Sequence, residues 1–517
     1  METNLARLAD TALDRLGDHP SLYFEGVWHS SATLHERSMR VASGLRDVGV
    51  APGDRVVVIM ANCPEVGILY HAIWRAGGVV TPVVFLVTAV ELRHILVDSG
   101  AVAVFTSPEL LPKVVEAVQD RPIRVVVVGT PTDGAITGFA DLEDGRDPLP
   151  IVDRSPDDLA ALMYTGGTTG RSKGVALSHR NLSNAGASSR ARSHVPGVNR
   201  GQISLPLSHA FGLLVTVGQM HVPEPGTSVL QRWFEPKSFL DLAVEHRTQT
   251  MAVVPSMLAM MLAFPLQDMD LSDLRFVFSG AAPLSPALRE EFQRKVPSVT
   301  VLEGYGCTET GGIVSGTPPL EPRPGTVGKA VPNVEVRIVG VDGNDLPPGQ
   351  DGEIVVRGPN VMQGYWGGEP IKDGWFHTGD IGRVDEDGYI TIVDRMKDLI
   401  IRGGYNVYPR DVEDALLDHP EVAMAAVVGR PDPRLGEEVV AFVSLAEGST
   451  ATEADLIEFT KGRLAAHKYP RTVTVLPQIP LTSVGKLDRK RLRAAVSEAV
   501  VPGQATPAPA EGVQADV

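Results

Sequence analysis

The apolar positions in the first third of the chain follow two alternating patterns. Short valine-rich runs, typical of strands buried on both faces, occur at Arg55–Met60, Val102–Thr106 and Ile123–Val128. Between them, Glu65–Ala76 and Ala89–Ser99 carry apolar residues at helical spacing. Because strands and helices alternate, the pattern predicts a parallel sheet with helices on both faces.

The same alternation returns after residue 250 and then changes. Thr250–Val254 and Leu274–Ser279 are predicted strands, and helices are expected from Ser256 and over Ser285–Lys295. From about residue 325 to 357, short β segments alternate with proline and glycine turns, which predicts a β-rich subdomain.

The remaining residues, from about Asp394, predict a small separate α+β domain. Its expected elements are the strands Ala423–Val428, Glu438–Ser444 and Thr472–Leu476 and the helices Pro409–Leu417 and Glu453–Ala466. The predicted fold class is α/β: a large N-terminal domain, 1–393, of parallel βα layers plus the β-rich subdomain, and a small domain, 398–497. The proline-, alanine- and glycine-rich end, 498–517, is expected to be disordered.

Composition narrows the possible functions. The 517 residues carry a formal net charge of −16, which argues against nucleic acid or an anionic membrane as the main partner. Cys63 and Cys307 are too far apart in sequence for a short metal or redox pair. The acidic N-terminus lacks the apolar core of a signal peptide, and the uncharged run Ala76–Val90 is too short and too broken for a membrane span. We therefore predict a cytoplasmic protein without a membrane span.

The stretch Tyr164–Gly174, YTGGTTGRSKG, has the composition of a phosphate-binding loop. Glycines let the backbone approach a phosphate, hydroxyls add donors, and Lys173 adds a positive charge. A mobile surface loop is the alternative. The predicted phosphate-binding residues are Thr165, Gly166, Gly167, Thr168, Thr169, Gly170 and Lys173.

Three other motif interpretations fit this chain less well. In a P-loop the lysine follows a glycine and precedes Ser or Thr, whereas Lys173 follows Ser172. The pair Gly304 and Gly306 begins a dinucleotide fingerprint, but the third glycine is missing. The letters around Ser172 spell the Gly-x-Ser-x-Gly of hydrolases, yet that serine needs a sharp strand-to-helix turn. A serine esterase is therefore a weaker alternative.

The same stretch resembles the phosphate loop of the adenylate-forming superfamily, which includes acyl-CoA synthetases, 4-coumarate ligases, firefly luciferase and the adenylation domains of peptide synthetases. Six more segments resemble that superfamily's motifs in the same order: Pro206–Leu213 (PLSHAFGL), Gly280–Leu284 (GAAPL), Gly304–Gly311 (GYGCTETG), Gly374–Gly382 (GWFHTGDIG), Asp394–Pro409 (DRMKDLIIRGGYNVYP) and Pro480–Lys490 (PLTSVGKLDRK). The resemblance covers about residues 1–495. It implies that ATP and Mg²⁺ activate a carboxylic acid to an acyl-adenylate, which is then transferred to the thiol of coenzyme A.

The resemblance also assigns residues to the nucleotide. Adenylation brings two anions together, so positive groups must offset the charge that builds up at the α-phosphate. Glu309 is expected to hold Mg²⁺ and Thr308 to donate to the α-phosphate. Tyr305, which follows Gly304, is expected to stack on adenine. The opposite wall is expected to be formed by Gly280, Ala281 and Ala282.

Further assignments concern the ribose and the reacting carboxylate. Asp380 is expected to accept hydrogen bonds from both ribose hydroxyls, with Arg395 as a second contact. From charge alone, Lys486 is expected to be a solvated surface lysine. The resemblance implies instead that it bridges the substrate carboxylate and the phosphate.

The second half-reaction implies a mobile small domain. In the superfamily this domain rotates about a hinge, expected here at 394–397 with Lys397 at the pivot, and brings the strand around Gly404 to the site. A residue without a side chain lets the pantetheine arm pass close to the backbone.

The acid and the thiol acceptor are less constrained by the sequence. His209 and Val253–Met257 are expected to line the acyl pocket, where His209 is either a gate or a packed histidine. No acidic residue occurs in Leu205–Val215, which argues against an amino acid and for an unsubstituted fatty or aryl acid; we predict a fatty acid. Without an obvious insertion in the large domain, coenzyme A is the expected acceptor, and an acyl carrier protein is the alternative. Ser172 stands where proline is usual.

Two further classes stay open: a luciferase-like oxygenase and a non-enzymatic binding protein. The second is disfavoured because Lys486, Glu309 and Asp380 are all present. A monomer or a homodimer is expected.

Overall fold

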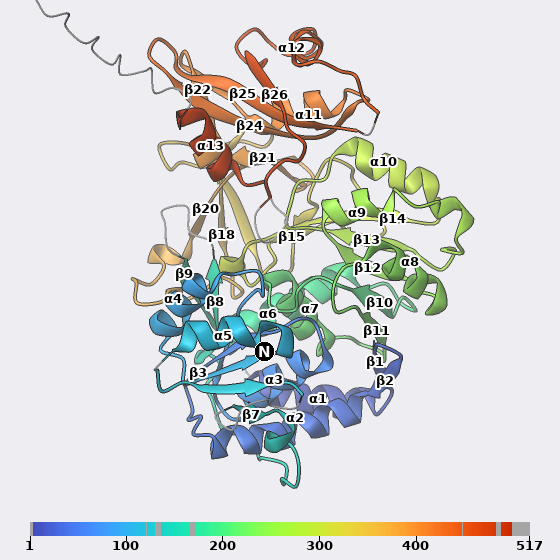
Figure 1. Cartoon of the computed structure of the whole chain (residues 1–517), viewed down its shortest axis with the longest axis vertical. Coiled ribbons are helices and arrows are strands. Elements are labelled where there is room, and N and C mark those ends of the chain that lie inside the picture. Colours follow the sequence, from blue (N-terminus) through green and yellow to red (C-terminus); the bar gives the residue numbers. More distant parts are fainter. Residues whose placement is uncertain are drawn as a thin grey trace, which may run out of the picture. The chain divides into compact units, whose positions relative to one another are not determined.

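A computed structural model of the chain describes residues 4–119, 121–129, 136–165, 172–446, 448–481 and 487–498. Three groups of predicted residues lie outside these ranges: Gly166–Gly170 of the phosphate loop, Lys486, and the C-terminal tail from residue 499. The chain divides into two compact units, 1–393 and 394–517, which are coloured blue to orange and orange to red in Figure 1. The first is the large α/β domain of the predicted fold class, and the second is a smaller α+β domain.

The valine-rich runs form one sheet of the first unit. Within the described ranges it has eight strands in the order β19 (Gly364–Tyr365), β9 (Lys173–Ser178), β8 (Leu159–Thr165), β4 (Val79–Pro82), β3 (Arg55–Ile59), β5 (Ala103–Thr106), β6 (Arg124–Val127) and β7 (Thr137–Gly138). Pairing is parallel from β8 to β7, while β8, β9 and β19 pair antiparallel. The predicted parallel sheet is thus confirmed, with an antiparallel extension at one edge.

A second sheet contains the predicted strands near residues 250 and 276. Its nine strands, counted over the same described residues, run in the order β16 (Lys329–Ala330), β15 (Ser315–Gly316), β14 (Thr300–Tyr305), β13 (Phe276–Ser279), β12 (Thr250–Val253), β10 (Arg200–Ile203), β11 (Thr227–Leu230), β1 (Pro20–Phe24) and β2 (Val27–Ser30). The strands from β14 to β1 are parallel. The carboxyl ends of β12, β13 and β14 therefore meet at one edge, the usual place for a ligand in such sheets.

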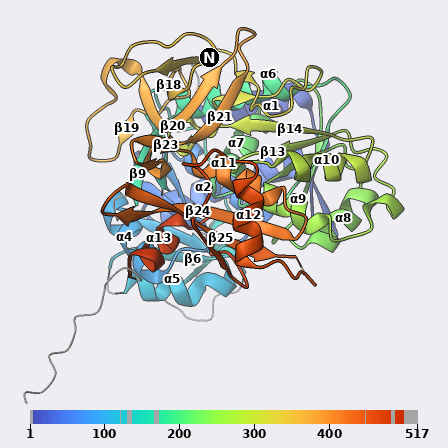
Figure 2. The ribbon, with the colours of Figure 1, turned by 90° about the horizontal axis from the view of Figure 1, so that it is seen from above.

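The β-rich subdomain is a sheet with the order β17 (Glu335–Val339), β18 (Gly352–Arg357), β20 (Phe376–Val384) and β21 (Ile390–Arg395), in which β18 pairs antiparallel with both β17 and β20. The helices of the first unit are α1 (Leu5–Leu16), α2 (Ser31–Asp47), α3 (Pro64–Arg75), α4 (Ala89–Ser99), α5 (Leu111–Val118), α6 (His179–Ser193), α7 (Ala210–Gln219), α8 (Pro236–Glu245), α9 (Pro255–Met261) and α10 (Pro286–Lys295). Figures 1 and 2 both show α9 and α10 beside β13 and β14.

The second unit has its own sheet and core. The sheet contains β23 (Tyr405–Val407), β22 (Ile400–Arg402), β25 (Gly436–Leu445) and β24 (Val422–Asp432), and β26 (Thr472–Val475) pairs parallel with β25. Its helices are α11 (Pro409–Leu417), α12 (Glu453–Lys461) and α13 (Arg489–Glu498). The predicted helix Glu453–Ala466 is too long, because the regular helix stops where Gly462, a poor helix former, occupies the C-cap.

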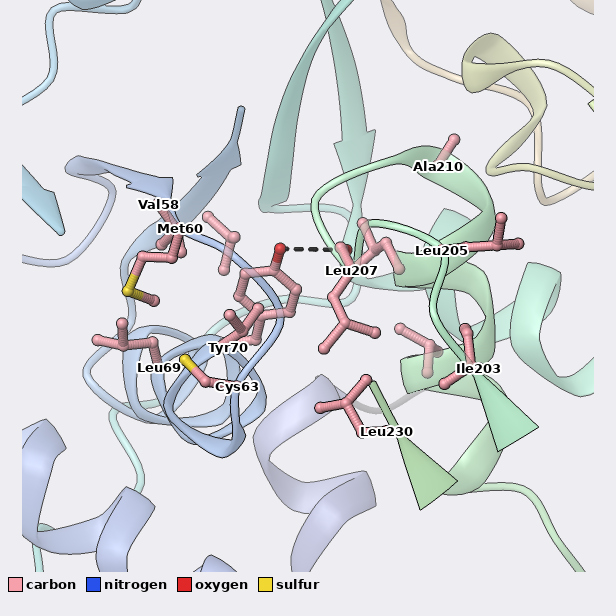
Figure 3. Packing of buried hydrophobic residues seen from close by; sticks show 14 of the residues in the cluster. Val58, Met60, Cys63, Leu69, Tyr70, Ile203, Leu205, Leu207, Ala210 and Leu230 are labelled. Atoms are coloured by element: carbon pink, nitrogen blue, oxygen red, sulfur yellow. Dashed lines mark hydrogen bonds between the residues drawn. The ribbon is translucent and has the colours of Figure 1, made fainter. Parts of the chain in front are cut away.

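The two large sheets of the first unit share one hydrophobic core. Tyr70 on α3 is fully buried in it, and its hydroxyl donates to the backbone oxygen of Leu207 at 3.2 Å (Figure 3). Asn62, which follows β3, accepts from the Leu207 N–H at 2.9 Å and donates to the Leu205 carbonyl at 3.0 Å. A buried polar group without a partner is costly, so these bonds fix the segment after β10 against α3. Over the described residues, no helix is long and apolar enough to cross a membrane.

The N-terminal helix is attached to the core by a partly buried carboxylate. Asp10 on α1 contacts Arg75 of α3 at 2.8 Å and His35 of α2 at 2.9 Å. Burial raises the pKa of Asp10, but the hydrogen bonds from His35 and Arg75 outweigh burial and lower the pKa from 3.8 to about 2. The ionised carboxylate therefore stabilises the fold above pH 3.8, and this contribution disappears as the pH falls from 3.8 towards 2.

We predict that Asp10→Asn lowers the free energy of unfolding of the first unit at pH 7 by about 1–2 kcal/mol. The shift itself corresponds to about 2 kcal/mol, reduced by solvent screening because the side chain is 34% exposed. The five tryptophans all lie in the first unit, so urea unfolding followed by tryptophan fluorescence measures it. The difference from wild type should shrink below pH 4, and the exposed Asp14→Asn on the same helix should show none. A difference that stays constant down to pH 3 would contradict this role for Asp10.

Candidate functional site

A tyrosine and an aspartate from two different sheets meet at the carboxyl end of β14. The hydroxyl of Tyr305, the last residue of β14, donates to Oδ2 of Asp380 on β20 at 2.6 Å. Asp380 is only 4% exposed, so its carboxylate needs such donors. Burial, and then the nearby charge of Asp380, raises the pKa of Tyr305, so the phenol stays protonated. The structure thus brings together two residues that the sequence assigned to one nucleotide.

Glu309 lies in a 3₁₀ turn, Thr308–Thr310, which follows β14. Its Oε1 accepts a hydrogen bond from the hydroxyl of Tyr365 at 2.9 Å, and its backbone oxygen accepts from the Met362 N–H at 2.8 Å. Burial, and then the charge of Glu309, raises the pKa of Tyr365, which keeps this phenol a donor. Thr308 and Glu309 are both half-buried.

Lys173 starts β9 and lies on the other side of Tyr365, with its Nζ 5.3 Å from the ring centroid. Thr165 and Lys173 are paired across β8 and β9, so the predicted phosphate loop connects two antiparallel strands. Ser172 therefore precedes a strand rather than a helix, and the serine esterase alternative is wrong because its strand-to-helix turn is absent at this position.

The glycine-rich segment after β13 lies against the end of β14. A Cβ atom placed on Gly280 would be 3.5 Å from the Gly304 oxygen and 3.5 Å from the ring of Phe211. Ala281 has φ = 66°, which is uncommon for a residue with a side chain and costs free energy. Such conformations gather at functional sites. The adjacent Ala282 is half-buried.

His209 has a local structural role. It is the N-cap of α7, and its Nδ1 accepts the Phe211 N–H at 3.3 Å. Because Tyr70 and Asn62 hold the preceding residues, the backbone at His209 is fixed. A side chain at position 280 would meet the ring of Phe211.

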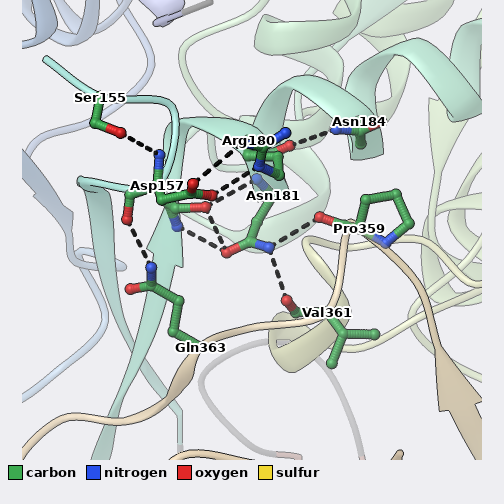
Figure 4. A network of polar contacts seen from close by, with 9 residues as sticks. Ser155, Asp157, Arg180, Asn181, Asn184, Pro359, Val361 and Gln363 are labelled. Atoms are coloured by element: carbon green, nitrogen blue, oxygen red, sulfur yellow. Dashed lines mark hydrogen bonds and ion pairs between the residues drawn. The ribbon is translucent and has the colours of Figure 1, made fainter. Parts of the chain in front are cut away.

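Two buried asparagines hold the segment that precedes Tyr365. The Asn181 amide, on α6, donates to the carbonyls of Pro359 and Val361, each at 2.8 Å (Figure 4). The Asn360 amide donates to the Thr310 carbonyl at 3.0 Å and to the Ile313 carbonyl at 2.6 Å. This segment is thereby fixed to α6 on one side and to the turn that carries Glu309 on the other.

The three predicted residues of the second unit that the structure describes, Arg395, Lys397 and Gly404, are on its surface. Arg395 and Lys397 are exposed at its start. Gly403 (φ = 59°) and Gly404 (φ = 83°) form the turn between β22 and β23, and positive φ at both positions is what a tight hairpin of this kind requires. A Cβ on Gly404 would meet nothing within 4 Å. The backbone conformation by itself therefore accounts for a glycine at this position.

The acidic residues of the first unit fit a metal ion that is bound together with a substrate phosphate, and not one that is enclosed by protein ligands alone. Mg²⁺ in proteins is usually bound through one or two carboxylates, several waters and the substrate's phosphates. Within the described ranges no three His, Cys, Asp or Glu side chains gather as a metal cage. The Glu309 carboxylate accepts the Tyr365 hydroxyl through Oε1. The donor set fits a metal held jointly with a phosphate.

Tyr365, Asn181 and Asn360 were not predicted from the sequence. Their partners lie 56, 178–180 and 47–50 positions away, and no local pattern marks such contacts. The one available signal was the Gly364–Tyr365 pair in a turn-rich segment.

Comparison with known proteins gives consistent matches. A family model described as AMP-binding enzyme matches residues 9–366, and one described as AMP-binding enzyme C-terminal domain matches residues 411–486. A feruloyl-CoA synthase of Amycolatopsis sp is 37% identical over 474 residues, covering 89% of this chain and 93% of that protein. The fatty acid–[acyl-carrier-protein] ligase ScoC of Streptomyces coeruleorubidus is 36% identical over 491 residues, covering 92% and 93%. The ATP-bound structure of MatB from Rhodopseudomonas palustris superposes with a TM-score of 0.88 at 33% identity, covering 96% and 100%.

We predict that Asn181→Ala lowers the free energy of unfolding of the first unit by about 2–4 kcal/mol. It leaves the buried Val361 carbonyl and the partly buried Pro359 carbonyl without donors, and it removes the capping bonds that Oδ1 of Asn181 accepts from Ser178. Asn184→Ala is the matched control. Among the described residues its amide bonds only to the Arg180 carbonyl of the same helix, at 2.9 Å, so a loss below about 1 kcal/mol is expected. Urea unfolding by tryptophan fluorescence compares them, and equal losses would show that the bonds to Pro359 and Val361 add nothing.

Proposed function

Because this chain belongs to the AMP-binding enzyme family, and is therefore an adenylate-forming acid–thiol ligase that uses ATP, Mg²⁺ and coenzyme A, we propose a fatty acid as its substrate and coenzyme A as its acceptor. The observation that carries the choice of acid is the apolar character of the residues around Gly280. The ring of Phe211 lies 3.5 Å from the position that a Cβ atom on Gly280 would take, and the Val253 carbonyl accepts the Gly280 N–H at 3.3 Å.

No acidic side chain stands between Leu205 and Val215 to hold an ammonium group. Met257, at the start of α9, adds a buried apolar side chain near the end of β12. An acid with an apolar body enters such surroundings favourably, because its apolar surface leaves water and no polar group loses a hydrogen-bond partner. A zwitterionic amino acid would leave a charge without a partner.

Several residues of the first unit are each assigned to a different part of the nucleotide. We assign adenine stacking to Tyr305, whose ring is fixed by its bond to Asp380. A carboxylate offers about four lone-pair sites, so Asp380 also accepts from the ribose hydroxyls. Glu309 and Thr308 face the phosphates, with Lys173 as a positive charge beside Tyr365. Mg²⁺ supplies positive charge that offsets the charge developing on the phosphates.

Residues outside the described ranges complete the site. Gly166–Gly170 offer backbone donors to the phosphates, and Lys486 neutralises the carboxylate and the phosphate that must approach each other. Arg395, Lys397 and Gly404 act from the second unit, in the ribose contact, the hinge and the passage of the pantetheine arm.

Two alternatives are each favoured by one relative. An aryl acid in place of a fatty acid is supported by the similarity to a feruloyl-CoA synthase. An acyl carrier protein in place of coenzyme A is supported by the similarity to ScoC.

The proposed substrate pair is tested by measuring pyrophosphate release with ATP, Mg²⁺ and a panel of fatty and aryl acids, with and without coenzyme A. We expect release that depends on a fatty acid and is stimulated by coenzyme A, with an acyl-CoA product. A higher kcat/KM for arylpropenoic acids would show that an aryl acid, and not a fatty acid, is the substrate. If a phosphopantetheinylated carrier protein stimulates the release and coenzyme A does not, the carrier protein is the acceptor.

We further predict that Lys486→Ala slows acyl-adenylate formation by about 10²–10³-fold, the usual loss when one charge-stabilising donor is removed. Transfer from supplied acyl-adenylate to coenzyme A should stay near the wild-type rate, because that step does not join the two anions. Single-turnover assays of each half-reaction separate the two effects. Adenylation at the wild-type rate would show that this lysine has another role.

A further inference from the structure

One short segment, Met362–Trp366, holds Glu309 at two points. The Met362 N–H donates to the Glu309 backbone oxygen at 2.8 Å, and three residues later the Tyr365 hydroxyl donates to Oε1 at 2.9 Å. The segment is itself fixed at its end, where the Trp366 N–H donates to the Gly174 carbonyl at 2.7 Å.

The same tyrosine also contacts the lysine of the phosphate loop. Tyr365 pairs with Val175 across β19 and β9, which places its ring beside Lys173 two positions away on β9. The Lys173 ammonium is 5.3 Å from the ring centroid, within the range of a cation–π interaction. One side chain therefore touches both a cation and a carboxylate assigned to the phosphates.

We propose that Tyr365 is a positioning residue that holds Glu309 in the orientation required to bind the divalent metal and keeps Lys173 beside it. The proposal rests on the metal-binding role proposed above for Glu309. Tyr365 acts through these two side chains and needs no contact with substrate.

The physical reason is the flexibility of a half-buried glutamate. Ordering a Glu side chain costs rotamer freedom, and an unrestrained Glu309 would meet that cost each time a metal binds. The Tyr365 hydroxyl fixes Oε1 in advance and so sets the direction of the carboxylate before a metal binds. Carboxylate ligands of metals are commonly hydrogen-bonded in this way, and loss of the supporting group lowers metal affinity by about 10–100-fold.

The test is Tyr365→Phe, which removes the hydroxyl and keeps the ring. Calorimetric titration with ATP, in the presence and in the absence of Mg²⁺, gives the ratio of the two affinities, which we call the Mg²⁺ factor. This measurement needs no turnover. We expect that factor to fall about tenfold, the lower end of the usual range, because Glu309 is half-buried rather than fully buried. The Mg²⁺ concentration for half-maximal pyrophosphate release should rise by the same factor, with kcat recovered at saturating Mg²⁺.

Tyr164→Phe is the matched control. Its hydroxyl donates to Asp98 Oδ2 at 2.6 Å from β8, the neighbour of β9, so the variant loses the same kind of bond away from Glu309. The Mg²⁺ factor should stay at the wild-type value in Tyr164→Phe, and urea unfolding shows whether both variants keep their fold. A second variant, Tyr365→Leu, removes the ring as well and should raise the KM for ATP beyond that of Tyr365→Phe.

Glu309→Gln separates the proposal from the function on which it rests. If Glu309→Gln lowers the Mg²⁺ factor and Tyr365→Phe does not, the role of Tyr365 is wrong and the metal assignment stands. If Glu309→Gln also leaves the factor unchanged, the metal assignment is wrong and the proposal for Tyr365 falls with it. A drop of similar size in Tyr164→Phe would equally overturn the specific role of Tyr365.

Discussion

The site depends on two carboxylates, one buried and one half-buried, that are each held by a tyrosine hydroxyl from another sheet. Asp380 on β20 accepts from Tyr305 on β14, and Glu309 in the turn after β14 accepts from Tyr365 on β19. A carboxylate that is taken out of water without hydrogen-bond donors is costly. The register of β19 and β20 against the end of β14 is therefore restricted, because a shift of one residue in either strand would leave an acid without its donor.

Close backbone contacts in the turn after β14 reinforce that register. A Cβ atom on Gly306 would lie only 2.5 Å from the Gly312 oxygen, so the chain can fold back on itself there only without a side chain. Asn360, fully buried, then bonds to the carbonyls on either side of Gly312. These contacts leave the turn little freedom. The backbone that carries Thr308 and Glu309 is thus rigid before any ligand arrives, and preorganised groups lose less entropy when they bind charge.

Sequence patterns predicted the elements better than the contacts between them. The valine-rich runs marked β3, β5 and β6 because burial on both faces requires continuous apolar residues. The two phosphate-loop ends, Thr165 and Lys173, were expected in one site, yet their pairing across antiparallel strands follows from sheet topology that no local pattern encodes. Tyr365 was missed for the same reason. His209 was found by its motif, but its role as the N-cap of α7 became visible only with the backbone of Phe211 in place.

The start of the second unit is bonded to that unit's own core. Asp394 is buried and accepts from the backbone of Arg410, and Asp398 is buried and accepts from Arg493 on α13 at 2.5 Å. One terminal nitrogen of Arg489, one turn earlier on α13, donates to both carboxylate oxygens of Glu413 at 2.6 and 2.7 Å. Breaking buried pairs of this kind is strongly unfavourable. The second unit therefore holds together as one body, and the exposed residues Arg395–Lys397 belong to that body.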